Sequence, residues 1–170
     1  VFWDGNSYKS PNTKAEPDDR PQALAVVSGL ADADKYDALY NVFLSQEFSS
    51  PYMEKYVCEA LFQMGKEDYA LKRLKKRFKF MVENREHTTL FEGWGAGKDG
   101  FGGGSTNHAW SGGGLTILSQ YVCGLYPLEP GWKKFTVKPN LVGLSYAETG
   151  NITMAGKIAI ALKKISSGME

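Results

Sequence analysis

The chain has 170 residues, a hydrophobic content of 42%, and 20 basic against 19 acidic residues, so that its net charge is +1. This length and composition predict a packed globular protein with a core of its own. The balanced charge argues against nucleic acid or an anionic membrane as a partner. No apolar run reaches the roughly 20 residues that a membrane-spanning helix needs.

Three helices are expected in the first part of the chain. The first covers about residues 20–30, and its ALAVV body is apolar on every side, as in a buried helix. The second covers about 34–47 and is amphipathic. The third begins in SSPYMEKY, with Ser50 as N-cap and Pro51 at the first helical position, and it ends at Gly65. Its broad apolar face includes two tyrosines, Tyr52 and Tyr56.

Two further helices are expected over about 67–84 and 110–122. One side of the fourth helix is densely basic, with Lys72, Arg73, Lys75, Lys76, Arg77 and Lys79. We interpret it as a solvated outer face, because the whole chain is nearly neutral, and a nucleic-acid surface is the alternative. Cys58 and Cys123 lie among apolar residues of the third and fifth helices, where each is expected to be a small buried hydrophobe.

The last part of the chain has a different character. The runs KFTVKP, GLSYAE, GNITMA and KIAIALKK predict three or four short strands. Helices followed by strands, without βαβ alternation, indicate segregated regions. Helices that alternate between apolar and amphipathic indicate two concentric layers. The predicted fold is therefore mainly α: a partial α/α toroid of about five helices over residues 1–126, then a small antiparallel β region over 127–170.

A glycine-rich segment, TTLFEGWGAGKDGFGGGSTNHAW, separates the fourth helix from the fifth. Ten of the 19 glycines lie between Gly93 and Gly114. A compact domain usually keeps so long a loop only for function, although a flexible surface connection is the alternative. Residues 95–100 match G-x-G-x-x-G, but they follow a helix end rather than a strand, so we interpret this match as coincidence. A P-loop fails as well, because Asp99 follows the lysine.

The flanks of the glycine run carry the candidate site residues. Glu92 lies between Phe91 and Trp94, and STNHAW adds His108 and Trp110. A carboxylate and polar donors among aromatic rings are typical of carbohydrate sites. The alternatives are a structural role for His108 and a helix-end role for Glu92.

Two other chemistries have weaker support. A hydrolase triad of Ser105, His108 and Asp99 is conceivable, but the sequence has no nucleophile elbow. A metal site lacks ligands, because His87 and His108 are the only histidines and neither has a partner at ligand spacing. No metal and no cofactor are therefore expected.

Four segments, taken in order, resemble the C-terminal half of bacterial α-L-rhamnosidases: SSPYMEKYVCEALFQMG, TTLFEGW, STNHAWSGGG and CGLYPLEPGWKKFTVKP. The resemblance extends from about Arg20 to Lys164. It implies an inverting glycoside hydrolase with an (α/α)6 barrel followed by a C-terminal β-sandwich. Residues 1–126 would then be part of the catalytic barrel, and 127–170 would be a segment of the sandwich.

The resemblance also implies roles for three residues. Glu92 would be the general base that activates the water attacking the anomeric carbon, His108 would contact the sugar, and Trp94 would be an aromatic wall. Inversion needs a second carboxyl group, the general acid, roughly 6.5–9.5 Å away. In the family this acid lies upstream, and nothing in these 170 residues matches its segment. Because the chain also begins with Val1, we expect a C-terminal fragment that is inactive, or nearly so, by itself.

The substrate implied by the resemblance is a glycoside with a terminal α-L-rhamnosyl residue. A bacterial protein of the cytoplasm or periplasm is expected, without membrane or nucleic-acid partners. A half barrel would expose the apolar faces of its end helices, so we expect it to pack against the remainder of the barrel or to self-associate. Two alternatives stay open: another glycosidase with an α/α toroid, and a non-catalytic carbohydrate-binding or structural remnant.

Overall fold

The computed structural model describes residues 2–95, 104–166 and 168–169. It divides into two compact units, Val1–Gly113 and Gly114–Glu170. Most of the predicted G-x-G-x-x-G segment lies outside the described residues. In the part of the chain that is described, no helix has the length and apolar character needed to cross a membrane.

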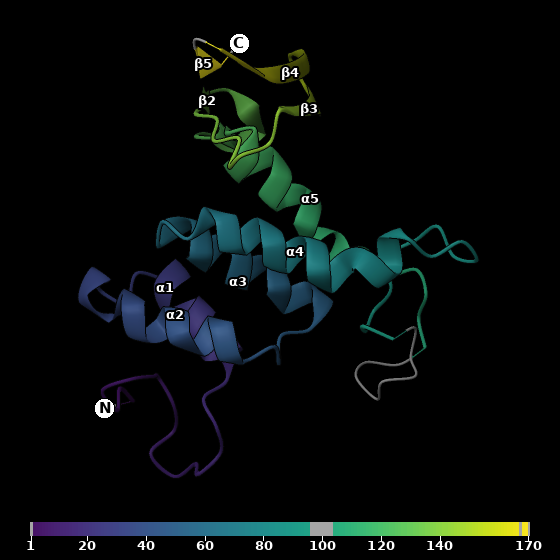
Figure 1. The fold of residues 1–170 in the computed structure, drawn as a ribbon. Coiled ribbons are helices and arrows are strands. Elements are labelled where there is room, and N and C mark those ends of the chain that lie inside the picture. Colours follow the sequence, from purple (N-terminus) through teal and green to yellow (C-terminus); the bar gives the residue numbers. More distant parts are fainter. Residues whose placement is uncertain (1, 96–103, 167, 170) are drawn as a thin grey trace. The chain divides into compact units, whose positions relative to one another are not determined.

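The first unit is built from helices (Figure 1). They are α1 (Asp19–Val27), α2 (Tyr36–Ser45), α3 (Pro51–Gln63) and α4 (Glu67–Val82), with 3-10 turns at Ala33–Lys35 and Ala109–Gly112. The predicted start of α3 is confirmed, because Ser50 is its N-cap and accepts a hydrogen bond from the Met53 N–H at 3.3 Å. The predicted fifth helix is present as successive pieces: the 3-10 turn, α5 (Gly113–Ile117) and a π-helical turn at Leu118–Val122.

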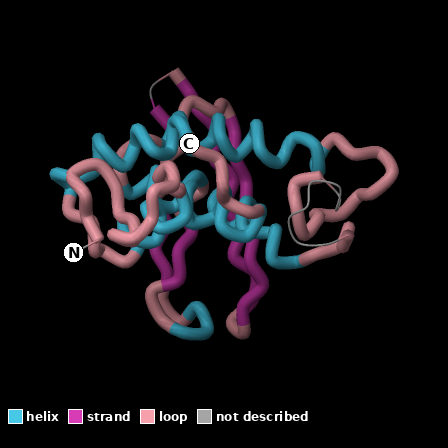
Figure 2. The backbone as a smooth tube through the Cα atoms, turned by 90° about the horizontal axis from the view of Figure 1, so that it is seen from below, coloured by secondary structure: helices cyan, strands magenta, loops and turns pink. Residues whose placement is uncertain are grey.

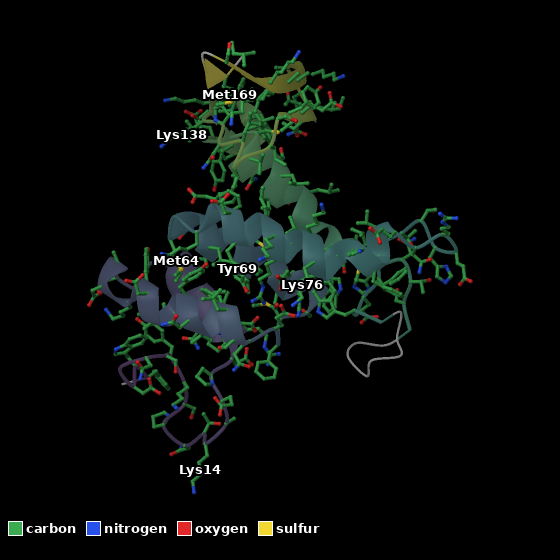
Figure 3. All side chains as sticks on the ribbon, in the orientation of Figure 1. Lys14, Met64, Tyr69, Lys76, Lys138 and Met169 are labelled. Carbon is green, nitrogen blue, oxygen red and sulfur yellow. The ribbon has the colours of Figure 1, made fainter. Side chains whose placement is uncertain are left out.

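The four longer helices enclose one hydrophobic core. Its fully buried members include Ala23, Leu39, Phe43, Val57, Leu61 and Ala70. Tyr69, labelled in Figure 3, reaches from α4 to α2 and donates a hydrogen bond to the Phe43 carbonyl at 2.9 Å. Its ring meets Tyr40 edge-on at 5.6 Å. Cys58 is also fully buried here, as predicted.

The segment before α1 is attached to the core through Gln22. Its fully buried amide accepts a hydrogen bond from the Tyr8 N–H at 2.7 Å and donates one to the Tyr8 carbonyl at 2.8 Å. Trp3 and Tyr8 pack against the core cluster. The prediction that the first helix is buried on every side was wrong at Leu24, which is 47% exposed, so that one side of α1 reaches the surface.

The basic side of α4 also differs from the prediction. Its lysines are exposed, namely Lys72, Lys75, Lys76 (labelled in Figure 3) and Lys79. Arg73 is instead completely buried, and the Arg77 side chain is only 8% exposed. The prediction of one solvated face was therefore wrong for both arginines. The two arginines are four residues apart, so they lie on the same side of α4. This side faces buried carboxylates of other helices.

These carboxylates belong to what we call the Arg73 cluster: Asp19, Ser49, Glu54, Arg73 and Arg77. The Arg73 guanidinium lies 2.5 Å from the Asp19 carboxylate and 2.6 Å from that of Glu54. It also donates to two backbone carbonyls at the end of α2, at 2.8 and 2.9 Å. Ser49 donates a hydrogen bond to Glu54. The cluster thus joins α1, α2 and α3 to α4.

The second unit holds two small antiparallel sheets. Strands β1 (Leu125–Pro127) and β2 (Phe135–Val137) form one, and β3 (Tyr146–Thr153), β4 (Gly156–Ile165) and β5 (Gly168–Met169) form the other, in that order. Figure 2 shows β3 and β4 as two long neighbouring strands, paired from Tyr146 with Lys163 to Thr153 with Gly156. The runs GLSYAE and GNITMA, two of the four runs expected to give three or four strands, both contribute to β3.

A small core and one glycine organise this second unit. Cys123, Leu141 and Leu162 form its buried cluster, so Cys123 is buried as predicted. Gly124 has φ +70°, and a Cβ there would lie 2.1 Å from the Lys138 carbonyl group. Only glycine permits this approach. It allows the Lys138 N–H to donate to the Gly124 carbonyl at 2.9 Å, which holds β2 beside β1.

Candidate active site

The two flanks of the glycine-rich segment lie side by side. The Glu92 N–H donates to the Ser105 carbonyl at 2.9 Å, and the His108 N–H donates to the Leu90 carbonyl at 2.8 Å. The Thr89 hydroxyl also donates to a carbonyl of the opposite flank. Backbone hydrogen bonds therefore bring together residues that are 13 and 18 positions apart in the sequence.

This pairing places the Glu92 and His108 side chains next to each other. Glu92 Oε2 lies 3.7 Å from His108 Nδ1, and the two side chains are 23% and 34% exposed. Among the described residues, no side chain or backbone N–H donates a hydrogen bond to the Glu92 carboxylate. Toward the described residues, the carboxylate therefore keeps acceptor positions for a water molecule or a ligand hydroxyl.

The residue before Glu92 is buried and is held in place by neighbouring side chains. Phe91 is fully buried, with the Phe80 ring 5.9 Å and the His87 ring 5.8 Å from its own. The buried Ser111 hydroxyl donates to the Phe91 carbonyl at 2.5 Å. Glu92 thus follows a residue that is anchored in the core, which restricts where its carboxylate can lie.

A row of aromatic rings continues from His108. The Trp110 ring lies 4.6 Å from that of His108, and its indole N–H donates to the Glu92 carbonyl at 3.3 Å. Tyr52 stacks on Trp110 at 5.5 Å, with 28° between the ring planes. Tyr56 follows edge-on at 5.6 Å, and the two tyrosine hydroxyls are 3.2 Å apart. We call His108, Trp110, Tyr52 and Tyr56 the aromatic row.

Sequence reasoning placed the two tyrosines on the apolar face of the third helix and gave them no part in the site. The structure leaves Tyr52 40% exposed. The available signal was their spacing of four residues, which puts both rings on one side of a helix. The sequence did not indicate that this side would meet the segment around Trp110.

A close backbone approach holds the row together. A Cβ at Gly113 would lie 2.6 Å from the Lys55 Cβ, so only glycine allows the chain after Trp110 to come this near to α3. The Lys55 ammonium lies 4.7 Å from the centre of the Tyr56 ring and 3.3 Å from Glu59. One end of the row is therefore bordered by an ion pair.

Trp94, the predicted aromatic wall, has different neighbours. Its indole N–H donates to the Ser49 carbonyl at 2.8 Å. The Arg77 guanidinium lies 4.3 Å from the centre of its ring, and Phe78 meets it edge-on at 5.1 Å. These contacts connect the segment after Glu92 to α4 and to the Arg73 cluster.

The other sequence candidates are the conceivable triad and a metal site. Ser105 contributes its carbonyl to the backbone pairing, whereas Asp99 of the conceivable triad lies outside the described residues. In the described part of the chain, no group of three or more His, Cys, Asp or Glu side chains could hold a metal ion.

Residues 124–170 match the family model described as the bacterial alpha-L-rhamnosidase C-terminal domain. The crystal structure of a GH78 family rhamnosidase of Bacillus sp. GL1 is similar in fold, with a TM-score of 0.80 and 20% sequence identity. The match covers 98% of this chain and 19% of that one. A search of the curated proteins finds no match.

The two comparisons confirm the resemblance to the C-terminal region of bacterial α-L-rhamnosidases. The sequence resemblance covers residues 124–170, and the resemblance in fold covers nearly the whole chain. The predicted fold class, a partial helical toroid followed by a small antiparallel β region, is confirmed as well. The chain spans about a fifth of the length of the rhamnosidase that it resembles.

Proposed function

We propose that this chain is the C-terminal part of an inverting α-L-rhamnosidase-like glycoside hydrolase, with Glu92 as its general base. The observation that supports this role best is the 3.7 Å contact between a part-exposed Glu92 carboxylate and His108, beside exposed aromatic rings. A carboxylate with unfilled acceptor positions can receive a proton from water. The resemblance to rhamnosidases is the reason for proposing L-rhamnose as the sugar.

In the proposed reaction, a water molecule hydrogen-bonded to Glu92 attacks the anomeric carbon of a terminal α-L-rhamnosyl residue. Its oxygen forms the new bond to carbon while its proton moves to the Glu92 carboxylate. The bond from carbon to the leaving oxygen breaks on the opposite face of the sugar. That oxygen receives a proton from a general acid outside these 170 residues. His108, 34% exposed at Glu92, would bind a sugar hydroxyl.

We assign Trp94 a supporting role in place of direct sugar contact. Its hydrogen bond to the Ser49 carbonyl and its packing under Arg77 tie the backbone just after Glu92 to α4. Catalytic geometry depends on such support, because small displacements of a reacting group are costly in rate.

The expected partner of the chain is the remainder of its own barrel. Apolar side chains are exposed on and near α1, with Phe2 at 65%, Leu24 at 47% and Leu30 at 65%. Alone, the 170-residue chain is expected to self-associate through them. Light scattering tests this, and a monodisperse monomer at tens of micromolar would contradict it.

The proposed role of Glu92 is tested by Glu92→Gln in a form of the protein long enough to hydrolyse 4-nitrophenyl α-L-rhamnopyranoside. We expect kcat to fall about 10²–10⁴-fold. Glu83→Gln, at an exposed glutamate after α4, is the matched control and should keep full activity. Turnover retained in Glu92→Gln would end the assignment.

Azide provides a second readout of the same role. Azide carries no proton that a base must remove, so it should restore turnover to Glu92→Gln. Its terminal nitrogen would bond to the anomeric carbon as the glycosidic bond breaks, giving a rhamnosyl azide of β configuration. An α product would show retention and contradict the inverting mechanism. The 170-residue chain alone should show no turnover.

A further inference from the structure

We propose that Arg77 is a positioning residue for the general base, and that it acts through Trp94. Arg77 belongs to α4, and Trp94 is the second residue after Glu92. This inference rests on the proposed function, because it takes Glu92 as the base. It adds a second role for the buried Arg73 cluster: besides joining helices, the cluster restricts where the Glu92 carboxylate lies during the reaction.

One backbone carbonyl joins the two side chains, namely that of Ser49, which is 1% exposed. It accepts a hydrogen bond from the Trp94 indole N–H at 2.8 Å and another from the Arg77 guanidinium. A carbonyl oxygen has two lone pairs, and both have a donor here. The guanidinium carbon also lies 4.3 Å from the centre of the Trp94 ring. A hydrogen bond therefore holds the edge of this ring, and a cation holds its face.

Arg77 is a firm support because several groups hold it in turn. Its side chain is 8% exposed. Its Nη1 donates to the Glu47 carbonyl at 2.9 Å and lies 3.3 Å from the Glu47 carboxylate, while its Nε lies 3.4 Å from Glu54 Oε2. These contacts fix the plane of the guanidinium, whose face then meets Trp94. A lysine would carry the same charge without the plane or the fork of donors.

The connection from Trp94 back to Glu92 is short. Gly93 alone lies between them, so the two Cα atoms are at most about 7 Å apart. A glycine has more backbone conformations than other residues, so the chain can turn here unless Trp94 is held. On its other side, Glu92 is held by its N–H bond to Ser105 and by a 3.3 Å bond from the Trp110 indole to its carbonyl. Holding Trp94 therefore restricts the backbone of Glu92 and the direction of its side chain.

The carboxylate needs this support because its own contact is weak. Glu92 Oε2 lies 3.7 Å from His108 Nδ1, and the Glu92 side chain is 23% exposed. A general base must direct a lone pair at the proton of the attacking water. A contact of this length does not fix that direction, so the direction depends on the backbone and on what holds it. Small displacements of a reacting group are costly in rate.

Kinetics of Arg77→Lys test the proposal in a form of the protein long enough to hydrolyse 4-nitrophenyl α-L-rhamnopyranoside. Lysine keeps a charge near Glu47 and Glu54 but cannot both cover the Trp94 ring and donate to the same carbonyl. We expect kcat to fall about tenfold and KM to stay within about twofold, because the alignment of the base matters in the transition state.

Lys76→Met is the matched control. Lys76 is the exposed neighbour of Arg77 in the sequence, and its ammonium lies 2.6 Å from the same Glu47 carboxylate. The substitution removes this surface ion pair, so kcat should stay within about twofold of the wild type. An equal fall of kcat in the control would trace the effect to Glu47 and overturn the inference.

A double-mutant cycle separates positioning from a general loss of structure. If Arg77 acts through the Glu92 carboxylate, Arg77→Lys should cost less than about twofold in kcat once Glu92→Gln has removed that carboxylate. A general loss of structure would instead lower kcat about tenfold in both backgrounds. This additive result, or an unchanged kcat in Arg77→Lys alone, would overturn the inference.

Trp94→Phe approaches the same connection from its other end. It keeps a ring beside Arg77 and removes only the donor to Ser49, so kcat should fall about threefold. The ion pairs of Arg77 stay in place, so this variant tests the proposal even if Arg77→Lys fails to fold. The same cycle applies, and a threefold loss that persists in the Glu92→Gln background would contradict the proposal.

Hydrogen exchange in the 170-residue chain gives a readout that needs no turnover. The four tryptophans give four indole N–H signals, and Trp94→Phe identifies that of Trp94. Arg77→Lys should accelerate exchange of this N–H about tenfold, because its bond to Ser49 loses its support. Lys76→Met should leave the exchange rate unchanged. An unchanged rate in Arg77→Lys would overturn the inference.

Failure of this inference differs from failure of the proposed function. If Glu92→Gln loses turnover while Arg77→Lys and Trp94→Phe keep it, Glu92 remains the base and the inference falls. If Glu92→Gln keeps full turnover, the proposed function falls, and the role given to Arg77 falls with it, whatever the exchange of the Trp94 indole shows.

Discussion

The first unit contains two groups in which a carboxylate lies beside a basic side chain, and the two differ in distance and in burial. In the Arg73 cluster, two carboxylates lie 2.5 and 2.6 Å from one guanidinium, and all three side chains are completely buried. In the pair of Glu92 and His108, the contact is 3.7 Å and both side chains are part-exposed. Among the described residues, the first group is enclosed by protein, and the second reaches the surface.

The difference indicates what each group does. A buried charge must be paired, so the Arg73 cluster uses its hydrogen-bonding capacity to hold helices together. A part-exposed pair contributes little to stability, so selection can keep its acceptors available for chemistry. Carboxylates that stabilise this fold and the carboxylate proposed to act on a substrate are therefore separable by measurement.

Removal of the central cation should have the largest effect. Arg73→Leu leaves Asp19 and Glu54 buried without their guanidinium, and we expect it to lower the free energy of unfolding by about 3–5 kcal/mol. Urea unfolding followed by circular dichroism measures this. Lys75→Leu, on the exposed side of α4, is the control and should change stability by less than about 0.5 kcal/mol. A decrease in unfolding free energy below about 1 kcal/mol for Arg73→Leu would contradict the stabilising role of the Arg73 cluster.

The pH dependence of stability tests the same cluster through Asp19. Burial raises the pKa of Asp19 above its ordinary value of 3.8, and attraction to Arg73 offsets this only in part. The folded state then holds a proton that the unfolded state releases. The contribution of Asp19 is therefore complete below its unfolded pKa and is lost as the pH rises through its folded pKa.

Relative to Asp19→Asn, the wild type should accordingly lose stability as the pH rises above about 4, by up to about 1.4 kcal/mol for each unit by which the pKa is raised. Urea unfolding of both proteins between pH 3.5 and 7 gives the difference. A difference that does not change with pH, or that changes in the opposite direction, would contradict the direction of the shift.

A smaller effect is expected from the hydroxyl that completes the cluster. Ser49→Ala removes the donor to Glu54 and an acceptor that Arg73 contacts at 3.2 Å, so we expect a loss of about 1–2 kcal/mol. Ser45→Ala is the matched control, because the exposed Ser45 hydroxyl bonds only to the backbone of its own helix. Equal losses for the two serines would show that the cluster is less tightly coupled than its geometry indicates.

The smallest effect on stability should come from the proposed base. Glu92→Gln keeps the side-chain shape and disrupts only a long, part-exposed contact, so the unfolding free energy should change by less than about 1 kcal/mol. The same substitution at the buried Glu54 should cost about 3 kcal/mol or more. Thermal and urea unfolding measure the loss of stability in both variants. Similar losses at the two sites would contradict the proposed difference between the Arg73 cluster and the pair of Glu92 and His108.

Much of the fold was predictable because its signals are local. Ser50 and Pro51 mark the start of α3, as read from SSPYMEKY, and the apolar spacing of α2 and α4 was sufficient to find both helices. The strand runs after residue 126 were found too, but GLSYAE and GNITMA lie in one strand, since β4 pairs continuously with β3. Strand pairing is not local, so alternation alone did not join them.

The candidate site was predictable only in part. Glu92 and His108 were singled out from TTLFEGW and STNHAW, and the structure places their side chains in contact. Tyr52 and Tyr56 were not connected with them, because the approach of α3 to this segment depends on Gly113 and on packing. The arginines of α4 were read as solvated, since no pattern within one helix shows that carboxylates of two other helices face them.

By itself, the sequence determined the order of helices and strands, the two flanks of the site and the resemblance to rhamnosidases. These rest on capping, periodicity and short motifs, which act within a few residues. The tertiary structure alone decided which charges are buried around Arg73, which rings form the aromatic row, and that Trp94 packs beneath Arg77. The physical reason is that burial and contact depend on segments far apart in the chain, whose meeting is set by the packing of whole helices.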